Sequence, residues 1–130
     1  MYSIRRKKFR NRKLDGSPAT HAQPDFVDTD WPMYRLADAY LMLAEAVVRG
    51  GTGATRAEAL NYVNAIRTRA YGIATGNIAH SQLTLHFILD ERARELYWEG
   101  HRRTDLIRFG KFTGGDYLWP SKGGGKGGVA

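Results

Sequence analysis

Cysteine is absent from this sequence of 130 residues, and so are long apolar runs. Without cysteine the chain can form no disulfide framework, no thiolate metal site and no lipidated cysteine, and the redox compartment stays open. No window approaches the ~18 consecutive apolar residues of a membrane-spanning helix, and no apolar region follows the charged start MYSIRRKKFRN as in a signal peptide. A hydrophobic fraction of 42% with 12% aromatic residues still suffices for the core of one domain.

The net charge of +7 is concentrated in one short stretch. Seven of the twenty basic residues lie within nine positions: Arg5, Arg6, Lys7, Lys8, Arg10, Arg12 and Lys13. The other thirteen basic residues balance thirteen acidic residues. The excess positive charge, and with it the high isoelectric point, therefore comes from one segment of the sequence and not from a basic face of the folded protein. Residues 5–13 could contact nucleic acid or anionic lipid, but we favour a solvated arm that lies against something outside this chain. Nucleic acid is therefore the alternative and not the expected partner.

Two amphipathic helices are predicted in the first half of the chain. Asp30 and Pro32 form a start signal for a helix from about residue 33 to residue 49, and a run of glycines from Gly50 then ends it. Apolar residues cover more than half of this helix and leave a narrow polar strip of Arg35, Asp38, Glu45 and Arg49. A second helix, capped by Thr55 or its neighbour, runs to about residue 70. Their lengths and small-residue seam are typical of a tetratricopeptide-type hairpin.

The stretch from 85 to 111 holds the third and fourth predicted helices. Thr84 can cap a helix from residue 85 to about residue 99, which Gly100 breaks, and a short helix follows over about 102–109. One face of the third helix carries Leu85, Leu89, Ala93, Leu96 and Gly100, with Ile88 and Arg92 at its edge. Phe87 and Trp98 fall together on a second apolar side, so this helix needs neighbours on two sides.

These segments predict an all-α fold. A helical hairpin of tetratricopeptide-like type would pack with a third long helix and a short fourth one, as a fragment of a larger α-helical fold. We divide the chain into an irregular basic lead-in (1–30), a helical scaffold (31–112) and a glycine-rich tail that we expect to be disordered (113–130).

The third helix also carries the residues that most resemble a catalytic site. Glu91, Glu95 and Glu99 form a carboxylate row, and His101 precedes Asp105 by four positions. Arginines stand three or four residues from these acids, so we interpret the group as a structural ion network. Its predicted members are Glu91, Arg92, Arg94, Glu95, Glu99, Arg102 and Asp105. We expect no catalytic residue, no metal site and no cofactor, because no nucleophile elbow, phosphate loop or dinucleotide fingerprint is present.

Three aromatic residues in predicted loops are weak candidates for stacking on sugar rings: Trp31, Tyr117 and Trp119. Sealing of hydrophobic edges is the favoured interpretation, since large aromatic side chains serve equally well as packing residues.

Three linked motifs between residues 34 and 111 resemble the C-terminal part of the SusD/RagB family. They are RLADAYLMLAEA at 35–46, ALNYVNAIRTRA at 59–70, and DERAREL, EGHR and DLIR at 90–96, 99–102 and 105–108. The resemblance implies a mostly helical glycan- or nutrient-binding lipoprotein at the outer-membrane surface. Such a protein would pass oligosaccharides to a SusC-like TonB-dependent transporter for import.

The resemblance covers scaffold motifs, so no sugar-binding residue is transferred to a numbered position. Family members are considerably longer than 130 residues, and the signal peptide, the lipidated cysteine and the earlier helices of the family pattern do not occur here. We therefore expect a fragment whose partners are an oligosaccharide, the transporter and the remainder of its own parent protein.

Overall fold

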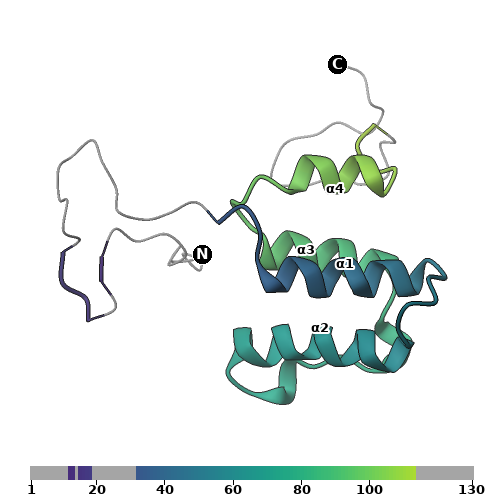
Figure 1. Ribbon diagram of the computed structural model, residues 1–130, viewed down its shortest axis with the longest axis horizontal. Helices are drawn as coiled ribbons and strands as arrows, with labels where there is room; N and C mark the ends of the chain where they lie inside the picture. Colours follow the sequence, from purple (N-terminus) through teal and green to yellow (C-terminus); the bar gives the residue numbers. More distant parts are fainter. Residues whose placement is uncertain (1–11, 14, 19–31, 114–130) are drawn as a thin grey trace, which may run out of the picture. The chain divides into compact units, whose positions relative to one another are not determined.

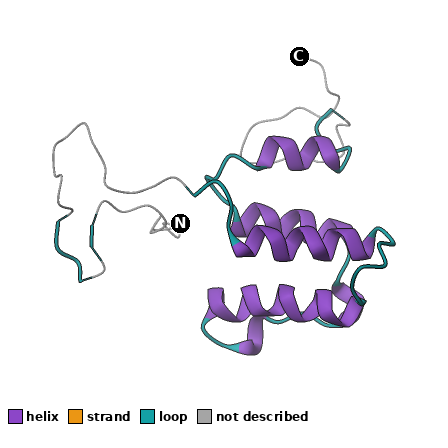
Figure 2. Cartoon of the chain, viewed as in Figure 1, coloured by secondary structure: helices purple, strands orange, loops and turns teal. Residues whose placement is uncertain are grey.

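The computed structural model describes residues 12–13, 15–18 and 32–113 of the chain (Figure 1). These residues form four α-helices and two short 3-10 helices: α1 (Leu36–Val48), α2 (Arg56–Tyr71), η1 (Ala74–Gly76), η2 (His80–Gln82), α3 (Leu85–Glu95) and α4 (Arg102–Arg108). Within the described ranges there is no β-strand, and Figure 2 shows helices joined by loops. The predicted all-α class with a short fourth helix is confirmed.

The chain divides into two compact units, residues 1–33 and residues 34–130. In the first unit, the described residues 12–13 and 15–18 make a tight turn. The Lys13 amide donates to the Ser17 carbonyl over 3.0 Å, and the Ser17 amide donates to an Asp15 carboxylate oxygen over 2.9 Å. Arg12 and Lys13 are exposed there, whereas the other five residues of the basic cluster lie outside the described residues. The glycine-rich tail from residue 114 onward lies outside them as well.

Helices α1 and α2 form the predicted antiparallel hairpin (Figure 1). The connection begins at Gly50, whose φ of +97° has a low conformational energy only in glycine. Thr55 caps α2 by accepting from the Glu58 amide, and the Glu58 carboxylate accepts from the Thr55 amide in return. The hairpin core is apolar, and its most deeply buried members are Leu41, Ala44, Ala59 and Val63. Helix α1 contacts α3 as well as α2, and α4 contacts α3.

The first helix starts later than the sequence predicts. Helix α1 begins at Leu36, and Arg35 precedes it in extended conformation without a side-chain cap. The predicted start near residue 33 is therefore wrong, and the proposed cap Asp30 lies outside the described residues. The backbone at Arg35 is extended and not helical, and the guanidinium of Arg35 contacts Glu95 and Glu99.

The third helix ends earlier than predicted, at Glu95 and not near Glu99. Thr84 does cap its start, accepting from the Phe87 amide over 3.1 Å. Beyond Leu96 the backbone turns, because Trp98 has φ of +68° and Gly100 has φ of +81°. Gly100 was predicted to break the helix, but the break begins before it.

The buried stripe of α3 is also shifted from its predicted position. Ile88 and Arg92, placed at the edge by the sequence pattern, are 0% and 2% exposed and lie at the centre of the packing face. Phe87 packs partly buried against the core, whereas Trp98 lies beyond the helix and is 59% exposed. The predicted second apolar side formed by Phe87 and Trp98 together is therefore wrong.

Candidate functional site: a buried ion-pair network

Arg92 lies at the centre of a buried group of charges that joins three helices. Its guanidinium is 2.7 Å from the Asp38 carboxylate of α1 and 2.9 Å from the Asp105 carboxylate of α4. All three side chains are almost fully buried. Removing such charges from water is costly, and it is tolerated when each charge faces an opposite one at short distance. Arg92 therefore fixes where α1, α3 and α4 meet.

Arg108 makes a second connection between α4 and α1. Its guanidinium donates to both Glu45 carboxylate oxygens, over 2.9 and 2.8 Å, and to Asp105 over 3.0 Å. Arg49 adds a hydrogen bond to Glu45 over 2.9 Å. Burial alone would raise the pKa of Glu45, but the hydrogen bonds and charges of Arg108 and Arg49 outweigh it and lower that pKa. The pKa of Arg108 is raised, chiefly by its hydrogen bond to Glu45.

Glu95 and Glu99 tie the end of α3 to the two helices of the hairpin. The Arg35 guanidinium donates to both Glu99 carboxylate oxygens, over 2.8 and 3.0 Å, and lies 3.0 Å from Glu95. Arg69 of α2 donates to the other oxygen of Glu95 over 2.6 Å. Desolvation lowers the pKa of Arg35, but its hydrogen bonds to Glu99 and Glu95 produce a net rise. The Glu95 carboxylate thus holds together the arginine that precedes α1 and an arginine of α2.

Glu91 connects α3 to α2 on another side of the helix. Arg67 of α2 donates to its carboxylate over 2.6 Å, and Arg94 does so over 2.7 Å. Both guanidiniums also lie over the Phe87 ring, at 5.3 and 5.7 Å from its centroid. The start of α3 is therefore covered by charged groups where the sequence suggested a second apolar neighbour.

We call these pairs the ion-pair network. The members expected from the sequence are all placed within the helical body, but their partners differ from the expected ones. Only Arg94 pairs with Glu91 inside α3, and Arg102 donates to the Leu89 carbonyl over 2.9 Å. Asp105 also pairs with Arg108 inside α4, whereas the ion pairs of Arg92, Glu95 and Glu99 connect α3 and the turn after it to other parts of the helical body. Members that sequence reasoning did not include are Arg35, Asp38, Glu45, Arg49, Arg67, Arg69 and Arg108.

Four of the missed members carried a signal in the sequence, because the narrow polar strip on the otherwise apolar first helix consists of Arg35, Asp38, Glu45 and Arg49. Asp38 and Glu45 are both 5% exposed, so this part of the strip is buried. A helix that is apolar nearly all round is buried between neighbours, and its few charged positions must then meet opposite charges on those neighbours.

The contacts of this network join helices through pairs of opposite charges. A general acid needs a carboxyl group whose pKa is raised, whereas Glu45 has a lowered pKa and its carboxylate faces two arginines. Asp105 faces Arg92 and Arg108, and its link to His101 is a backbone hydrogen bond to the His101 carbonyl. Among the described residues no three His, Asp or Glu side chains converge as metal ligands. The expected lack of catalytic residues stays a prediction.

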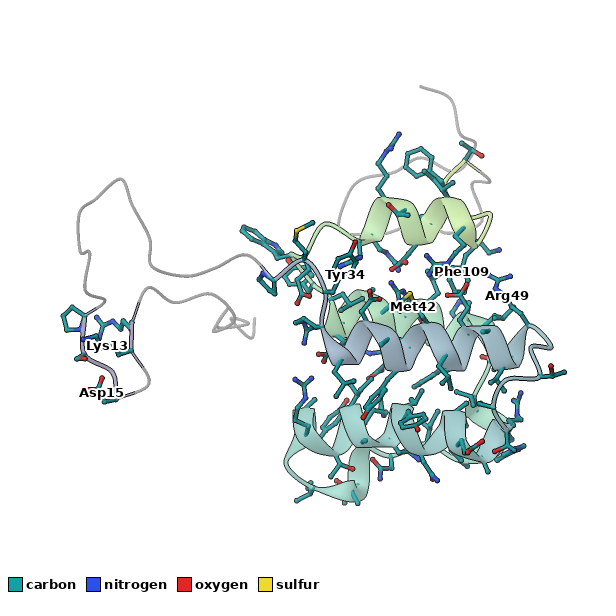
Figure 3. All side chains as sticks on the ribbon, viewed as in Figure 1. Lys13, Asp15, Tyr34, Met42, Arg49 and Phe109 are labelled. Atoms are coloured by element: carbon teal, nitrogen blue, oxygen red, sulfur yellow. The ribbon has the colours of Figure 1, made fainter. Side chains whose placement is uncertain are left out.

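The weak glycan-binding candidates Trp31, Tyr117 and Trp119 lie outside the described residues. A shallow groove of about 200 Å³ does lie between α1 and α2, lined by Arg35, Leu36, Ala37, Tyr40, Ala65, Ile66 and Arg69. Figure 3 shows the side chains of the described residues, with Tyr34 next to the start of α1. Each helix of the described part is too short or too polar to cross a lipid bilayer.

The described residues from 34 to 113 form an all-helical body whose helices are joined by arginine–carboxylate pairs. The sequence matches the model of the SusD family over residues 1–127, and the chain belongs to that family. The resemblance found in the three motifs is thereby confirmed.

Two curated relatives illustrate the match. The chain is 44% identical over 123 residues to the starch-binding protein SusD of Bacteroides thetaiotaomicron, covering 95% of this chain and 20% of that protein. It is 36% identical over 105 residues to the SusD-like protein P25 of Formosa agariphila, covering 77% of this chain and 18% of that one. The chain thus spans about a fifth of the length of these relatives.

Proposed function

We propose that this chain supplies the C-terminal scaffold of a SusD-like nutrient-binding protein. The whole protein captures oligosaccharides at the outer-membrane surface and passes them to a SusC-like TonB-dependent transporter. The observation that carries this proposal is the 44% identity, across 95% of the chain, to a protein named for starch binding. The glycan itself is not fixed by this similarity, because one missing sugar hydroxyl or one reshaped pocket can change specificity strongly.

The scaffold role rests on how the polar groups of the helical body are used. The buried carboxylates Asp38, Glu45, Glu91, Glu95 and Asp105 each face arginine side chains at 2.6–3.0 Å. A sugar site instead needs polar groups that are free to bond hydroxyl groups beside an accessible aromatic face. In the described body, the polar side chains hold helices together, and this supports a structural role in a larger binding protein.

A chimera tests the proposal. The segment of the Bacteroides starch-binding protein that matches this chain is replaced by residues 1–127, and starch affinity is measured by electrophoresis in gels that contain starch. A scaffold segment should preserve the fold without supplying the sugar contacts. We therefore expect the chimera to bind starch within about threefold of the parent, and the isolated chain to migrate as it does without starch.

Two outcomes would contradict the proposal. A folded chimera without starch affinity would show that this chain does not fit a starch-binding protein of this family. An isolated chain that binds starch as tightly as the parent would show that it contains the glycan site and is not only scaffold. In the chimera, Trp31→Ala and Trp119→Ala separate these roles further, because packing or scaffold residues should leave starch affinity unchanged.

The transporter contact is tested separately. A tagged chimera is mixed with the Bacteroides transporter partner of the parent protein in detergent, and co-purification is compared with that of the parent. We expect equal recovery. A chimera that binds starch but does not recover the transporter would limit the function of this chain to glycan capture.

A further inference from the structure

One end of the helical body gathers most of its exposed large apolar side chains. Nine such side chains are exposed between residues 34 and 113, and six of them belong to the start of α1, the end of α2 and the turn after α3. The six are Tyr34, Leu36, Tyr71, Ile73, Tyr97 and Trp98, and we call them the apolar end. The other three, Met42, Ile107 and Phe112, lie elsewhere on the body.

Ion pairs of the network show that these three segments lie together. Arg35, at the start of α1, contacts Glu95 and Glu99 on either side of Tyr97 and Trp98. Arg69, two residues before Tyr71, contacts the same Glu95. Figure 1 shows the start of α1, the end of α2 and the end of α3 on the same side of the body. The three segments of the apolar end are therefore held together by the buried carboxylates of Glu95 and Glu99.

Trp98 is the most unusual residue of this end. Its φ of +68° is rare for a bulky side chain and costs on the order of 1–3 kcal/mol. The indole is nevertheless 59% exposed, with its ring 6.3 Å from that of Tyr97. A strained backbone that holds a large aromatic side chain in solvent is expected where a partner later covers the side chain.

We propose that the apolar end is a docking surface for the remaining four fifths of a SusD-family polypeptide, whether joined to this chain or supplied separately. The length of the relatives supports this occupant, because the chain accounts for 20% and 18% of them while 95% and 77% of its own length is matched. Those proteins therefore contain about four times as much further polypeptide as the part that this chain matches. This inference rests on the proposed scaffold function and names the surface through which the scaffold acts.

A split-protein experiment tests the docking surface. The full chain is co-expressed with a tagged Bacteroides starch-binding protein that lacks the matched segment, and complex formation is measured without starch. We expect the chain to co-purify, and Trp98→Gly or Tyr34→Ser to weaken binding at least tenfold because each removes an exposed apolar contact. Phe112→Ser, the matched change of an aromatic side chain that is 49% exposed elsewhere, should stay within twofold.

Folding is controlled within the same series. Glycine adopts positive φ without strain, so Trp98→Gly should leave the melting temperature of the isolated chain unchanged or raise it. Lower affinity with an unchanged or higher melting temperature is then a loss of contact and not of structure. Tyr34→Ser is a second probe, since Tyr34 is 83% exposed and precedes α1.

Several results would overturn the docking proposal. One is that the unaltered chain fails to bind the truncated relative, and another is that the Trp98→Gly and Phe112→Ser variants bind it equally well. A dimer of the chain that dissociates on Trp98→Gly would also overturn the proposal, because the occupant of the surface would then be a second copy. Failure of the proposed function is distinct, because a complex that forms through the apolar end but does not hold starch overturns that function and not the docking surface.

Discussion

The two faces of α1 are held in opposite ways. Towards α2 the contacts are apolar, with Leu41 and Ala44 packed against Ala59 and Val63. Towards α3 and α4 the contacts include buried ion pairs, because Arg108 of α4 joins Glu45 and Arg92 of α3 joins Asp38 to Asp105. Apolar burial depends little on pH or salt, whereas ion pairs weaken when a carboxylate is protonated and, where they are partly exposed, when salt screens them.

The difference teaches how a short helix can be held in a defined place. Helix α4 has seven residues, of which Asp105 is buried while Ile107 is half exposed. Such a helix is marginal in isolation and has little apolar surface to bury. Arginine–carboxylate pairs are directional, so they specify one position for α4 against α1 and α3.

The largest predicted effect comes from breaking the centre of the ionic face. Arg92→Met leaves Asp38 and Asp105 buried without their central partner, and we expect the free energy of unfolding to fall by about 3–5 kcal/mol. Urea denaturation measures it. Arg94→Met is the control, because that side chain is 53% exposed and its ion pair should contribute at most about 1 kcal/mol. Equal losses for the two variants would contradict the central role of Arg92.

A compensated variant sharpens this prediction. Replacing Asp38 and Asp105 by leucine together with Arg92→Met removes all three charges, so no buried charge is left unpaired. We expect this variant to regain at least half of the stability lost by Arg92→Met alone, since well-packed apolar residues can replace buried ion pairs. If stability falls further instead, the charges themselves contribute more than their burial costs.

The apolar face is tested by Leu41→Ala. Leu41 is 0% exposed, and its truncation should lower the free energy of unfolding by about 3 kcal/mol through lost burial and a residual cavity. Met42→Ala is the neighbouring control, because Met42 is half exposed and should change stability by less than about 1 kcal/mol. The Leu41 effect should be the same in low and high salt. A salt-dependent loss would mean that the two faces are not separate.

The sequence was most informative where local chemistry decides the structure. Thr55 and Thr84 cap α2 and α3 as predicted, because a hydroxyl and an amide a few residues apart are readable from spacing. The helices and their all-α class followed from periodicity. The start of α1 after Arg35 and the end of α3 before Leu96 did not follow from periodicity. Tertiary ion pairs and the turn at Trp98 override the local preference for helix there.

The partners of the ion-pair network were the least predictable part. Spacing along one helix suggested that Glu95 and Glu99 pair with nearby arginines, but they pair with Arg35 and Arg69, far along the chain. A helical wheel contains no information on which other helix faces a given charge. Three-dimensional packing was needed to see that Arg92 is central and not peripheral.

The smallest mutational effect concerns the cap of α2. Thr55→Ala removes the hydroxyl that accepts from the Glu58 amide, and we expect about 1 kcal/mol lower stability by thermal denaturation. Thr52→Ala, in the same connection, is the control and should be nearly neutral. The cap is local to the hairpin, so its effect should add to that of Arg92→Met within about 0.5 kcal/mol. Strong non-additivity would show that hairpin and ionic face form one unit.

Native-state hydrogen exchange as a function of pH tests the central claim that α4 is held by ions and the hairpin by apolar contacts. The pKa of Glu45 is lowered in the folded state, so its stabilisation is present above the ordinary Glu pKa of about 4.3 and is lost as pH falls through the lower folded value. Between about pH 6 and pH 3, the protection factors of the α4 amides should fall at least tenfold more than those of the α2 amides around Val63. Equal loss in both helices across that range would contradict the account.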